Sequence, residues 1–274
     1  EITCGKFFLD LSSPAVMGIL NLTPDSFSDG GRFNDCDSAV RHALAMVKQG
    51  AAIIDIGGES TRPGAQAVTV QQELDRVMPV VEAVVAELPV PVSVDTSKPE
   101  VMRAAIGAGA GMINDVMALR SKGAIEAVSD AGNVAVCLMH MQGEPRTMQK
   151  NPHYGDVVSE VRDFLLERAS VCEKGGIASS RILLDPGFGF GKMLEQNIAL
   201  LKNIGQLAGE GYPLLVGISR KSMIGQLLGE APVDRRLHGS VAAAVIAAMQ
   251  GASILRVHDV RETVDALKIV EALL

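Results

Sequence analysis

The sequence predicts a single (β/α)8 barrel, the TIM-barrel architecture, with a short N-terminal strand or hairpin extension. Eight short apolar runs of strand type alternate with longer segments of helical periodicity. The runs are continuously apolar, which is typical of parallel strands covered on both faces. No Pro/Ser-rich linker or change in composition divides the 274 residues, so we expect one domain spanning residues 1–274.

The predicted strands can be placed in order along the chain. They cover residues 15–20, 52–56, 90–94, 112–113, 134–138, 182–184, 214–218 and 254–257. The apolar residues before position 14 (Phe7, Phe8, Leu9 and Leu11) indicate an additional strand or hairpin that closes the bottom of the barrel.

Helices are predicted between these strands. The clearest covers residues 70–88, where apolar side chains recur at the spacing of one helix face. Two helix starts are also indicated. Ser97 to Glu100 reads as a capping box with a proline in the first turn, and Thr69 to Gln72 reads as a weaker one.

Composition excludes several classes of protein. The net charge of −7 argues against a general nucleic-acid binder, which usually carries a basic face. The longest strictly apolar run, residues 241–249, is well short of the ~20 residues of a membrane-spanning helix, and the N-terminus shows no secretory pattern. Four widely spaced cysteines predict reduced thiols in a cytoplasmic protein.

Unusual polar residues follow the predicted strands at the ends where a barrel carries its active site. The first two strands lead into NLTPDSFSDGG (21–31) and GGESTRPG (57–64). The later strands lead into DTS (95–97), ND (114–115), MHMQ (139–142), DPGFGFGK (185–192), SRKS (219–222) and RVH (256–258). A single such segment is as often a helix cap or a solvated loop, but eight of them at one end of a sheet predict a ligand site.

Two common ligand motifs are absent from the glycine-rich segment 187–192. The dinucleotide pattern requires a glycine where Lys192 stands, and the P-loop pattern requires a Ser or Thr where Met193 stands. We expect these glycines to let the backbone approach a flat ligand or to allow a mobile loop. The five histidines lack zinc-site spacing, whereas Mg²⁺ held jointly with a phosphate needs few protein ligands.

The charges of the segments after the strands indicate the kind of ligand. Asp95 and Asp185 each follow an apolar strand and therefore need partners, and two parallel N–H donors of an amino-bearing heterocycle would suit a carboxylate. Asn114 can bind a neighbouring ring edge. Lys221 and Arg256 lie after strands 7 and 8, where such barrels often bind phosphate. Alternatively, Asp95 and Asp185 are barrel-lining residues in ion pairs with Lys221 and Arg256.

The long segments at 21–31, 57–64, 185–192 and 219–222 closely resemble the signature loops of bacterial dihydropteroate synthases, in order and at family-like spacing from about Val16 onward. The resemblance implies a Mg²⁺-dependent transferase of folate biosynthesis. It would join 6-hydroxymethyl-7,8-dihydropterin diphosphate to 4-aminobenzoate, giving 7,8-dihydropteroate and diphosphate. It also implies inhibition by sulfonamides and a homodimer. Because the first two loops are rich in Gly, Ser and Asp, we expect them to be mobile lids that become ordered once diphosphate is present. The apolar last helices would supply the dimer surface.

The resemblance also implies roles for particular residues. Catalysis would rest on Asp95, Asp185, Lys221 and Arg256. The pterin would be bound by Asp95, Asn114, Asp185 and Lys221, lined by Met139 and Phe190, and stacked on Arg256. The diphosphate would be held by Asn21, Thr61, Arg256 and His258, with Asn21 also contacting Mg²⁺, and Val257 would be a further substrate-binding residue. The aminobenzoate site would be shaped by Phe27, Thr61, Arg62, Pro63, Lys221 and Ser222.

Three other functions compete with this interpretation. A pterin-binding barrel could instead transfer a methyl group from a reduced folate to a cobalamin partner, although it would have no use for an anion cluster at Arg256 and His258. Lys221 could serve as the nucleophile of a Schiff-base aldolase. A third alternative is a pterin-binding protein without turnover.

Overall fold

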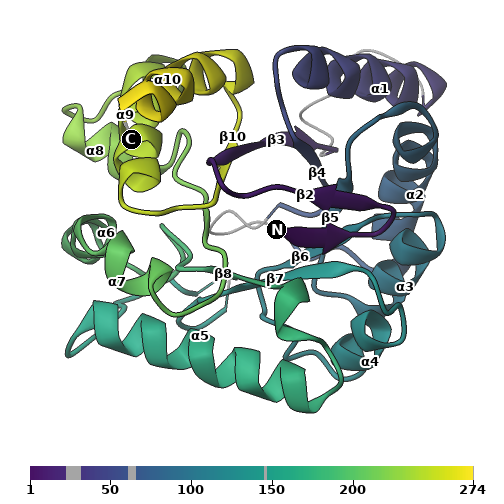
Figure 1. The fold of residues 1–274 in the computed structure, drawn as a ribbon, viewed down its shortest axis with the longest axis horizontal. Helices are drawn as coiled ribbons and strands as arrows, with labels where there is room; N and C mark the ends of the chain where they lie inside the picture. Colours follow the sequence, from purple (N-terminus) through teal and green to yellow (C-terminus); the bar gives the residue numbers. More distant parts are fainter. Residues whose placement is uncertain (23–31, 61–65, 145–146, 274) are drawn as a thin grey trace.

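The computed structural model describes residues 1–22, 32–60, 66–144 and 147–273, and helices surround a parallel barrel in it (Figure 1). The barrel strands pair in the order β8-β7-β6-β5-β4-β3-β10-β9, and every pair is parallel. They are β3 (Ala15–Asn21), β4 (Ile53–Gly57), β5 (Val92–Asp95), β6 (Met112–Asp115), β7 (Ala135–Met139), β8 (Ile182–Asp185), β9 (Leu215–Val216) and β10 (Ile254–Val257).

The barrel closes between β8 and the segment that leads into β9. Leu184 forms an isolated parallel bridge with Leu214, and its N–H donates to the carbonyl of Pro213 at 3.0 Å. This sparse pairing explains why β9 is shorter than the predicted run over residues 214–218. All eight predicted strands are confirmed, and those ending at Asp95, Asp115 and Asp185 extend into the polar residues that were expected to follow them.

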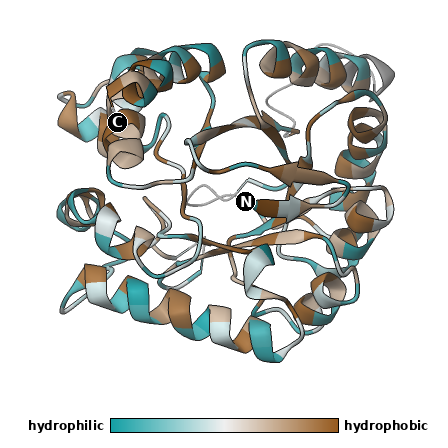
Figure 2. Cartoon of the chain, viewed as in Figure 1, coloured by the Kyte–Doolittle hydropathy of each residue, from teal (hydrophilic) through white to brown (hydrophobic). Residues whose placement is uncertain are grey.

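A ring of helices covers the outside of the barrel (Figure 1). The helices are α1 (Arg32–Lys48), α2 (Val70–Glu87), α3 (Pro99–Gly107), α4 (Ala124–Ser129), α5 (Val157–Lys174), α6 (Leu194–Lys202), α7 (Ile204–Ala208), α8 (Ser222–Leu227), α9 (Leu237–Met249) and α10 (Val260–Leu273), with short 3-10 helices η2 (Ser179–Arg181) and η3 (Val233–Arg235). Figure 2 shows the strands largely brown and the helices divided between brown and teal, as expected where one helix face packs on the sheet. No helix in the described part of the chain is both long and apolar enough to cross a bilayer.

One predicted helix cap is confirmed and the other is wrong. Thr69 caps α2 as expected, because its hydroxyl accepts from the N–H of Gln72 while the Gln72 side chain accepts from the N–H of Thr69. At α3 the N-cap is Lys98, which makes no side-chain capping bond. Ser97 instead donates to Asp115 on β6 at 2.5 Å, so a partner distant in sequence takes the hydroxyl expected to cap the helix.

The predicted N-terminal hairpin is present and covers the bottom of the barrel. β1 (Ile2–Cys4) and β2 (Phe7–Leu9) pair antiparallel and lie in front of the strands in Figure 1. Ile2 and Cys4 are buried against inward-facing strand residues, among them Met17, Ile53 and Met112. This apolar plug fills the lower half of the barrel interior and leaves the carboxyl ends of the strands for polar side chains.

Candidate active site

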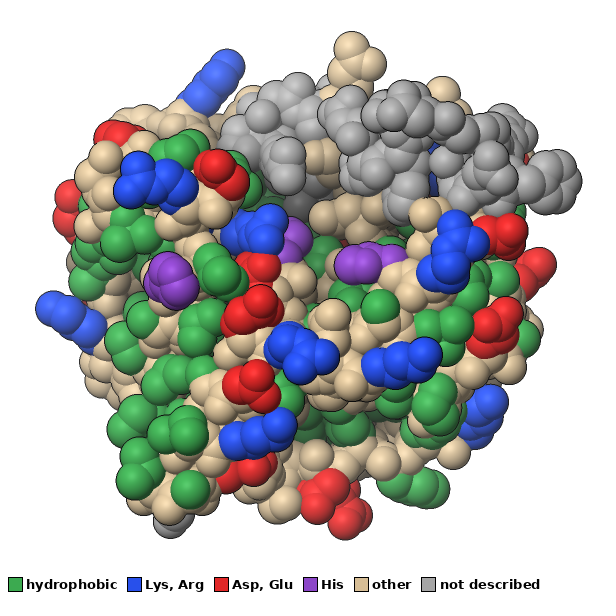
Figure 3. Space-filling view, turned by 90° about the horizontal axis from the view of Figure 1, so that it is seen from above, with side chains coloured by type: hydrophobic (Ala, Val, Ile, Leu, Met, Phe, Trp, Pro, Cys, Tyr) green, Lys and Arg blue, Asp and Glu red, His purple; other side chains and the backbone are tan. Residues whose placement is uncertain are grey.

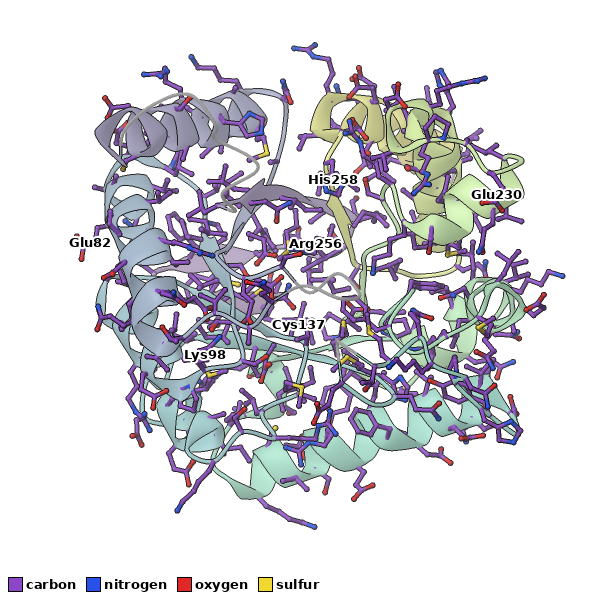
Figure 4. All side chains as sticks on the ribbon, turned by 180° about the vertical axis from the view of Figure 1, so that it is seen from behind. Glu82, Lys98, Cys137, Glu230, Arg256 and His258 are labelled. Atoms are coloured by element: carbon purple, nitrogen blue, oxygen red, sulfur yellow. The ribbon has the colours of Figure 1, made fainter. Side chains whose placement is uncertain are left out.

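Alternation along the strands brings the polar residues to one edge of the barrel interior. Because side chains two apart share a face, strand register places the last inward residues level with one another. Asn21 pairs with Gly57, Gly57 with Asp95, and Asp95 with Asn114 across neighbouring strands. Farther round the barrel, Met139 pairs with Asp185. Figure 4, seen from behind, shows Arg256 at the centre of this end of the barrel.

Arg256 is the centre of a charged cluster inside the barrel. Its Nε donates to Asp55 Oδ2 at 2.6 Å and its Nη2 donates to Asp95 Oδ2 at 3.1 Å. Asn114 Nδ2 donates to the same Asp55 oxygen at 3.2 Å. These contacts confirm the ion pair foreseen for Asp95, and they tie β4, β5, β6 and β10 together.

Asp55 is a central member of this cluster that sequence reasoning missed. It is fully buried, and its second oxygen has no hydrogen-bond partner within the described part of the chain. Asp55 lies within the apolar run 52–56, two residues after the inward-facing Ile53, so a carboxylate inside a buried strand was the available signal. A buried carboxylate needs a cation, and Arg256 supplies it.

Burial governs the protonation of this cluster. It raises the pKa of Asp95 to about 7, although the Arg256 guanidinium opposes that shift. Desolvation acts to lower the pKa of Arg256, but the carboxylates of Asp55 and Asp95 outweigh it and leave that pKa above its ordinary value. Arg256 is therefore charged at any physiological pH, whereas Asp95 changes charge near neutrality.

Asp185 has a different environment from Asp95. Its Oδ1 accepts from the N–H of Gly187 at 2.7 Å, and it forms no ion pair with any described residue. Burial raises its pKa, and the nearby Lys221 charge opposes the rise. The alternative in which Lys221 and Arg256 pair with both aspartates is thus wrong for Asp185. The second Asp185 oxygen has no hydrogen-bond partner among the residues that the structure describes, and it can accept from a ligand donor.

Lys221 lies beside the glycine-rich segment. Its ammonium donates to the carbonyl of Phe188 and lies 4.4 Å from the centre of the Phe190 ring, a cation–π distance. Burial lowers the pKa of Lys221 to about 8, and the Asp185 carboxylate opposes that shift. The side chain is poised between charged and neutral forms near physiological pH.

His258 and the SRKS segment form the neighbouring corner of the site. Ser219 Oγ lies 3.1 Å from His258 Nδ1, and the His258 N–H donates to the same oxygen at 3.2 Å. Arg220 forms an ion pair with Asp259 that includes an Nε–Oδ2 contact of 3.0 Å. Ser222 begins α8 and is exposed. Figure 4 shows Arg256 and His258 at this end of the barrel; Arg256 lies on β10, and His258 is the first residue after that strand.

Two of the residues expected to line the pterin pack together in the structure. Met139 and Phe190 belong to one apolar cluster that also contains Val116, Met141 and Met148. Val257 lies in the core between the sheet and the helices, because it alternates with Arg256 and His258. Any contact of Val257 with a ligand would therefore come from its backbone.

Glycines in the 187–191 segment allow two stretches of protein backbone to lie close together, whereas the sequence suggested an approach to a flat ligand. A Cβ on Gly187 would lie 2.0 Å from the carbonyl oxygen of His140, and one on Gly191 would lie 2.4 Å from that of Gln142. Both residues also have positive φ angles, 68° and 61°. These glycines let the β8–α6 loop pack against the β7–α5 loop, and the approach is between protein backbones.

Several expected site residues lie outside the described residues. These are Phe27, Thr61, Arg62 and Pro63, together with the expectation of mobile lids. Asn21 is described and ends β3. A Cβ on Gly57 would lie 3.9 Å from both Asn21 Oδ1 and Asp95 Oδ2, so these oxygens lie on either side of a side-chain-free gap.

Comparisons with known proteins agree with this geometry. The family model described as "Pterin binding enzyme" matches residues 17–258. The dihydropteroate synthase of Escherichia coli strain K12 is 58% identical over 266 residues, which cover 97% of this chain and 94% of the relative.

Two solved structures are also similar. The Xanthomonas albilineans dihydropteroate synthase with 4-aminobenzoic acid has a TM-score of 0.94 and 54% identity, covering 99% of this chain and 97% of its own. The Yersinia pestis dihydropteroate synthase with a sulfonamide drug has a TM-score of 0.94 and 55% identity, covering 99% and 98%.

Proposed function

This chain belongs to the pterin-binding enzyme family and acts as a dihydropteroate synthase, and we propose that it does so with the side chains at the carboxyl ends of β5, β6, β8 and β10. The reaction joins 6-hydroxymethyl-7,8-dihydropterin diphosphate to 4-aminobenzoate and yields 7,8-dihydropteroate and diphosphate. The observation that carries the proposed roles is the convergence of Asp95, Asn114 and Asp185 on one edge of the barrel, close to Arg256.

The proposed pterin site uses complementary hydrogen bonding. No described donor bonds to the second oxygen of Asp185, so this carboxylate can accept N–H groups of an amino-bearing heterocycle, and the Asn114 amide can bind the adjacent ring edge. Met139 and Phe190 supply an apolar wall for a flat ring. Together these groups orient the ring and exclude water from it.

Departure of the diphosphate is the main electrostatic demand of the reaction. The bond between the methylene carbon and a diphosphate oxygen breaks, and the amine nitrogen bonds to that carbon and then loses a proton. Arg256 uses Nε and Nη2 on the two carboxylates, and its Nη1 makes no hydrogen bond to another described residue. We assign Nη1 and His258 to the departing anion. Asp95 and Asp185 stabilise positive charge that develops on the pterin.

The chain also fits a Mg²⁺ ion bound together with the diphosphate. No group of three or more His, Cys, Asp or Glu side chains that could hold a metal occurs in the described part of the chain. Asn21 Oδ1, beside the gap over Gly57, is a hard oxygen donor, and Mg²⁺ commonly takes one or two protein ligands plus phosphate oxygens. When bound, the ion would neutralise charge on the leaving diphosphate.

A turnover assay tests the function and the metal together. Purified protein, dihydropterin diphosphate and 4-aminobenzoate are followed by diphosphate release and product mass, with Mg²⁺ or with a chelator. We expect dihydropteroate to form and turnover to drop at least tenfold in the chelator, and to return with added Mg²⁺. Unchanged turnover in the chelator contradicts the metal, and pterin binding without product contradicts the enzyme function.

We further propose a homodimer formed through α9 and α10. A groove of about 330 Å³ between these helices is lined by Val245, Met249, Ala266, Ile269, Val270 and Leu273. Met249, Ile269 and Leu273 are more than half exposed, a concentration that favours an interface. Figure 3 shows hydrophobic side chains gathered toward the left of the face that it views, on the side where Figure 1 places these helices.

The dimer is tested by light scattering on two variants. Ile269→Asp is expected to give a monomer, because it buries an unpaired charge in the interface. Phe8→Asp changes another exposed apolar residue, on the N-terminal hairpin, and is expected to leave the dimer intact. A monomeric wild type, or a dimeric Ile269→Asp, contradicts this interface. We also propose a cytoplasmic location, because all four cysteines are free and three of them are buried.

A further inference from the structure

Lys192 ends the glycine-rich segment and is almost completely buried. Its exposed fraction is 3%, and within the described residues no carboxylate lies at ion-pair distance from it. A buried ammonium without a carboxylate is costly unless its N–H groups are all bonded. Something other than charge pairing therefore keeps this side chain inside the protein.

Oxygen and nitrogen acceptors surround the Lys192 ammonium. Its Nζ lies 2.9 Å from the carbonyl oxygen of Gly187, 3.1 Å from that of Phe190, and 2.9 Å from His140 Nδ1. A fourth acceptor, the carbonyl of His140, lies at 3.3 Å. Burial lowers the pKa of His140 to about 2, so its ring is neutral and its Nδ1 can accept. As an ammonium, Nζ donates to all three short acceptors; burial also lowers the pKa of Lys192 well below its ordinary value, and the neutral amine still has two N–H groups for the carbonyls of Gly187 and Phe190.

Side-chain donors bind the backbone carbonyls along the whole segment 187–192. Each carbonyl from Gly187 to Lys192 accepts a side-chain donor, taken in order from Lys192, Lys221, Gln149, Lys192, Tyr154 and Asn197. Among the described residues, Lys192 is the only one of these donors that takes two carbonyls of the 187–192 segment, whereas the second carbonyl bound by Asn197 belongs to Met193. Lys192 therefore draws both ends of the stretch 187–190 toward one point.

Those two carbonyls belong to residues that touch the pterin site. Gly187 donates its own N–H to Asp185 Oδ1 at 2.7 Å, so the position of Gly187 orients the Asp185 carboxylate. Phe190 places its ring 4.4 Å from the Lys221 ammonium. One buried ammonium therefore acts, through the backbone, on the carboxylate and on the aromatic wall of the same site.

We propose that Lys192 is a positioning residue of the pterin site, which fixes Asp185 and Phe190 by binding the carbonyls of Gly187 and Phe190. The inference rests on the proposed function, since it concerns how the same site binds its pterin substrate. Lys192 makes no substrate contact in this assignment. Its loss should weaken pterin binding because the carboxylate and the ring lose a fixed relative position.

The test compares three variants by calorimetry with dihydropterin diphosphate and by steady-state kinetics. Lys192→Met keeps an unbranched side chain that is one atom shorter and removes the N–H donors. Lys202→Met, an exposed lysine at the end of α6, is the matched control. Tyr154→Phe removes a different tie, the one to the carbonyl of Gly191, and leaves both Lys192 carbonyls bound.

We expect Lys192→Met to raise the Kd and KM for dihydropterin diphosphate about tenfold or more, with kcat changed less than about threefold. Lys202→Met and Tyr154→Phe should stay within about threefold of wild type for all these constants. Two results would overturn the proposal and show that Lys192 only stabilises the fold. One is that Tyr154→Phe weakens pterin binding as much as Lys192→Met does. The other is that Lys192→Met binds the pterin like the wild type although its Tm is lower.

Two further outcomes are distinguishable. If Lys192→Met does not fold, the milder variant Lys192→Gln replaces it, because glutamine keeps two N–H donors. Lys192→Gln should fold and weaken pterin binding about threefold. Pterin binding at the wild-type level by this variant overturns the proposal. If the wild-type protein itself does not bind dihydropterin diphosphate, the proposed function fails, independently of Lys192.

Discussion

Replacing Asp185 by Asn tests the pterin site most directly, because the substitution changes one group and keeps its shape. Asp185 Oδ1 accepts from the N–H of Gly187 at 2.7 Å, and the side-chain amide oxygen that Asp185→Asn introduces can accept the same bond. The second carboxylate oxygen, which is assigned to the pterin, becomes an NH₂ group. A donor then faces the donors of the ring.

The expected loss of pterin affinity follows from replacing this hydrogen-bond acceptor by a donor. A hydrogen bond to a charged group contributes roughly 1.5–3 kcal/mol, and each 1.4 kcal/mol is about a factor of ten in an equilibrium constant. We therefore expect Asp185→Asn to raise the Kd for dihydropterin diphosphate by roughly 10- to 100-fold. Calorimetry at fixed pH and ionic strength measures this, with the exposed Asp130→Asn as a control for removal of one charge.

Folding stability should move in the other direction or not at all. Burial raises the pKa of Asp185, so above the ordinary carboxyl pKa the folded protein holds a charge that the unfolded chain holds more easily. An amide removes this penalty while keeping the Gly187 bond, so the Tm at pH 7 should be equal to or above that of the wild type. A near-wild-type Kd, or a weaker Kd that comes with a large loss of Tm, would refute the assignment of this carboxylate as a pterin ligand.

Four other predictions follow from the same cluster and its surroundings. Arg256→Ala should raise the KM for dihydropterin diphosphate, and an unchanged KM would contradict the assignment of Arg256 to the anion. The same variant should lower the free energy of unfolding by about 3–5 kcal/mol, because the fully buried Asp55 carboxylate loses its ion pair. The kcat/KM for this substrate should rise with pH through about 7, where Asp95 loses its proton, and fall above about 8, where Lys221 loses its proton. Asp95→Asn should abolish the rise near pH 7. If the rise persists in this variant, it belongs to another group. Sulfonamides should inhibit competitively with 4-aminobenzoate, and full activity at high sulfonamide would contradict this expectation. Thr69→Ala should lower the free energy of unfolding by about 1 kcal/mol in a denaturant titration while kcat/KM stays at the wild-type value, since the residue only caps α2.

Much of the site was predictable because strand ends in a barrel share one edge. Asp95, Asn114, Asp185 and Arg256 each end or interrupt an apolar run, and the register brings them together as expected. Asp55 was missed because it lies inside its apolar run, where strand patterning alone shows no difference between the barrel interior and the helix-facing side. Its inward position two residues from Ile53 becomes meaningful only once the barrel is closed.

In two places the structure shows a contact that the local sequence pattern did not predict. Ser97 has the local pattern of a helix cap, yet Asp115 on the next strand takes its hydroxyl. The glycines of the 187–191 segment suit a ligand-facing loop, yet Gly187 and Gly191 face the backbone of the neighbouring loop. In each case a local pattern competes with a contact from a different strand–helix unit, and the local pattern carries no information about that unit.

The amino-acid sequence by itself determined the order of strands and helices and the residue types at the strand ends, because periodicity and capping act over a few neighbouring residues. The tertiary structure alone decided which of those residues became partners. Arg256 lies 201 residues from Asp55 and 161 from Asp95, and it meets both only because β10, the last strand of the chain, pairs with β3, the first strand of the barrel. Partner choice among buried charges depends on distances across the barrel, and those distances exist only in the folded protein.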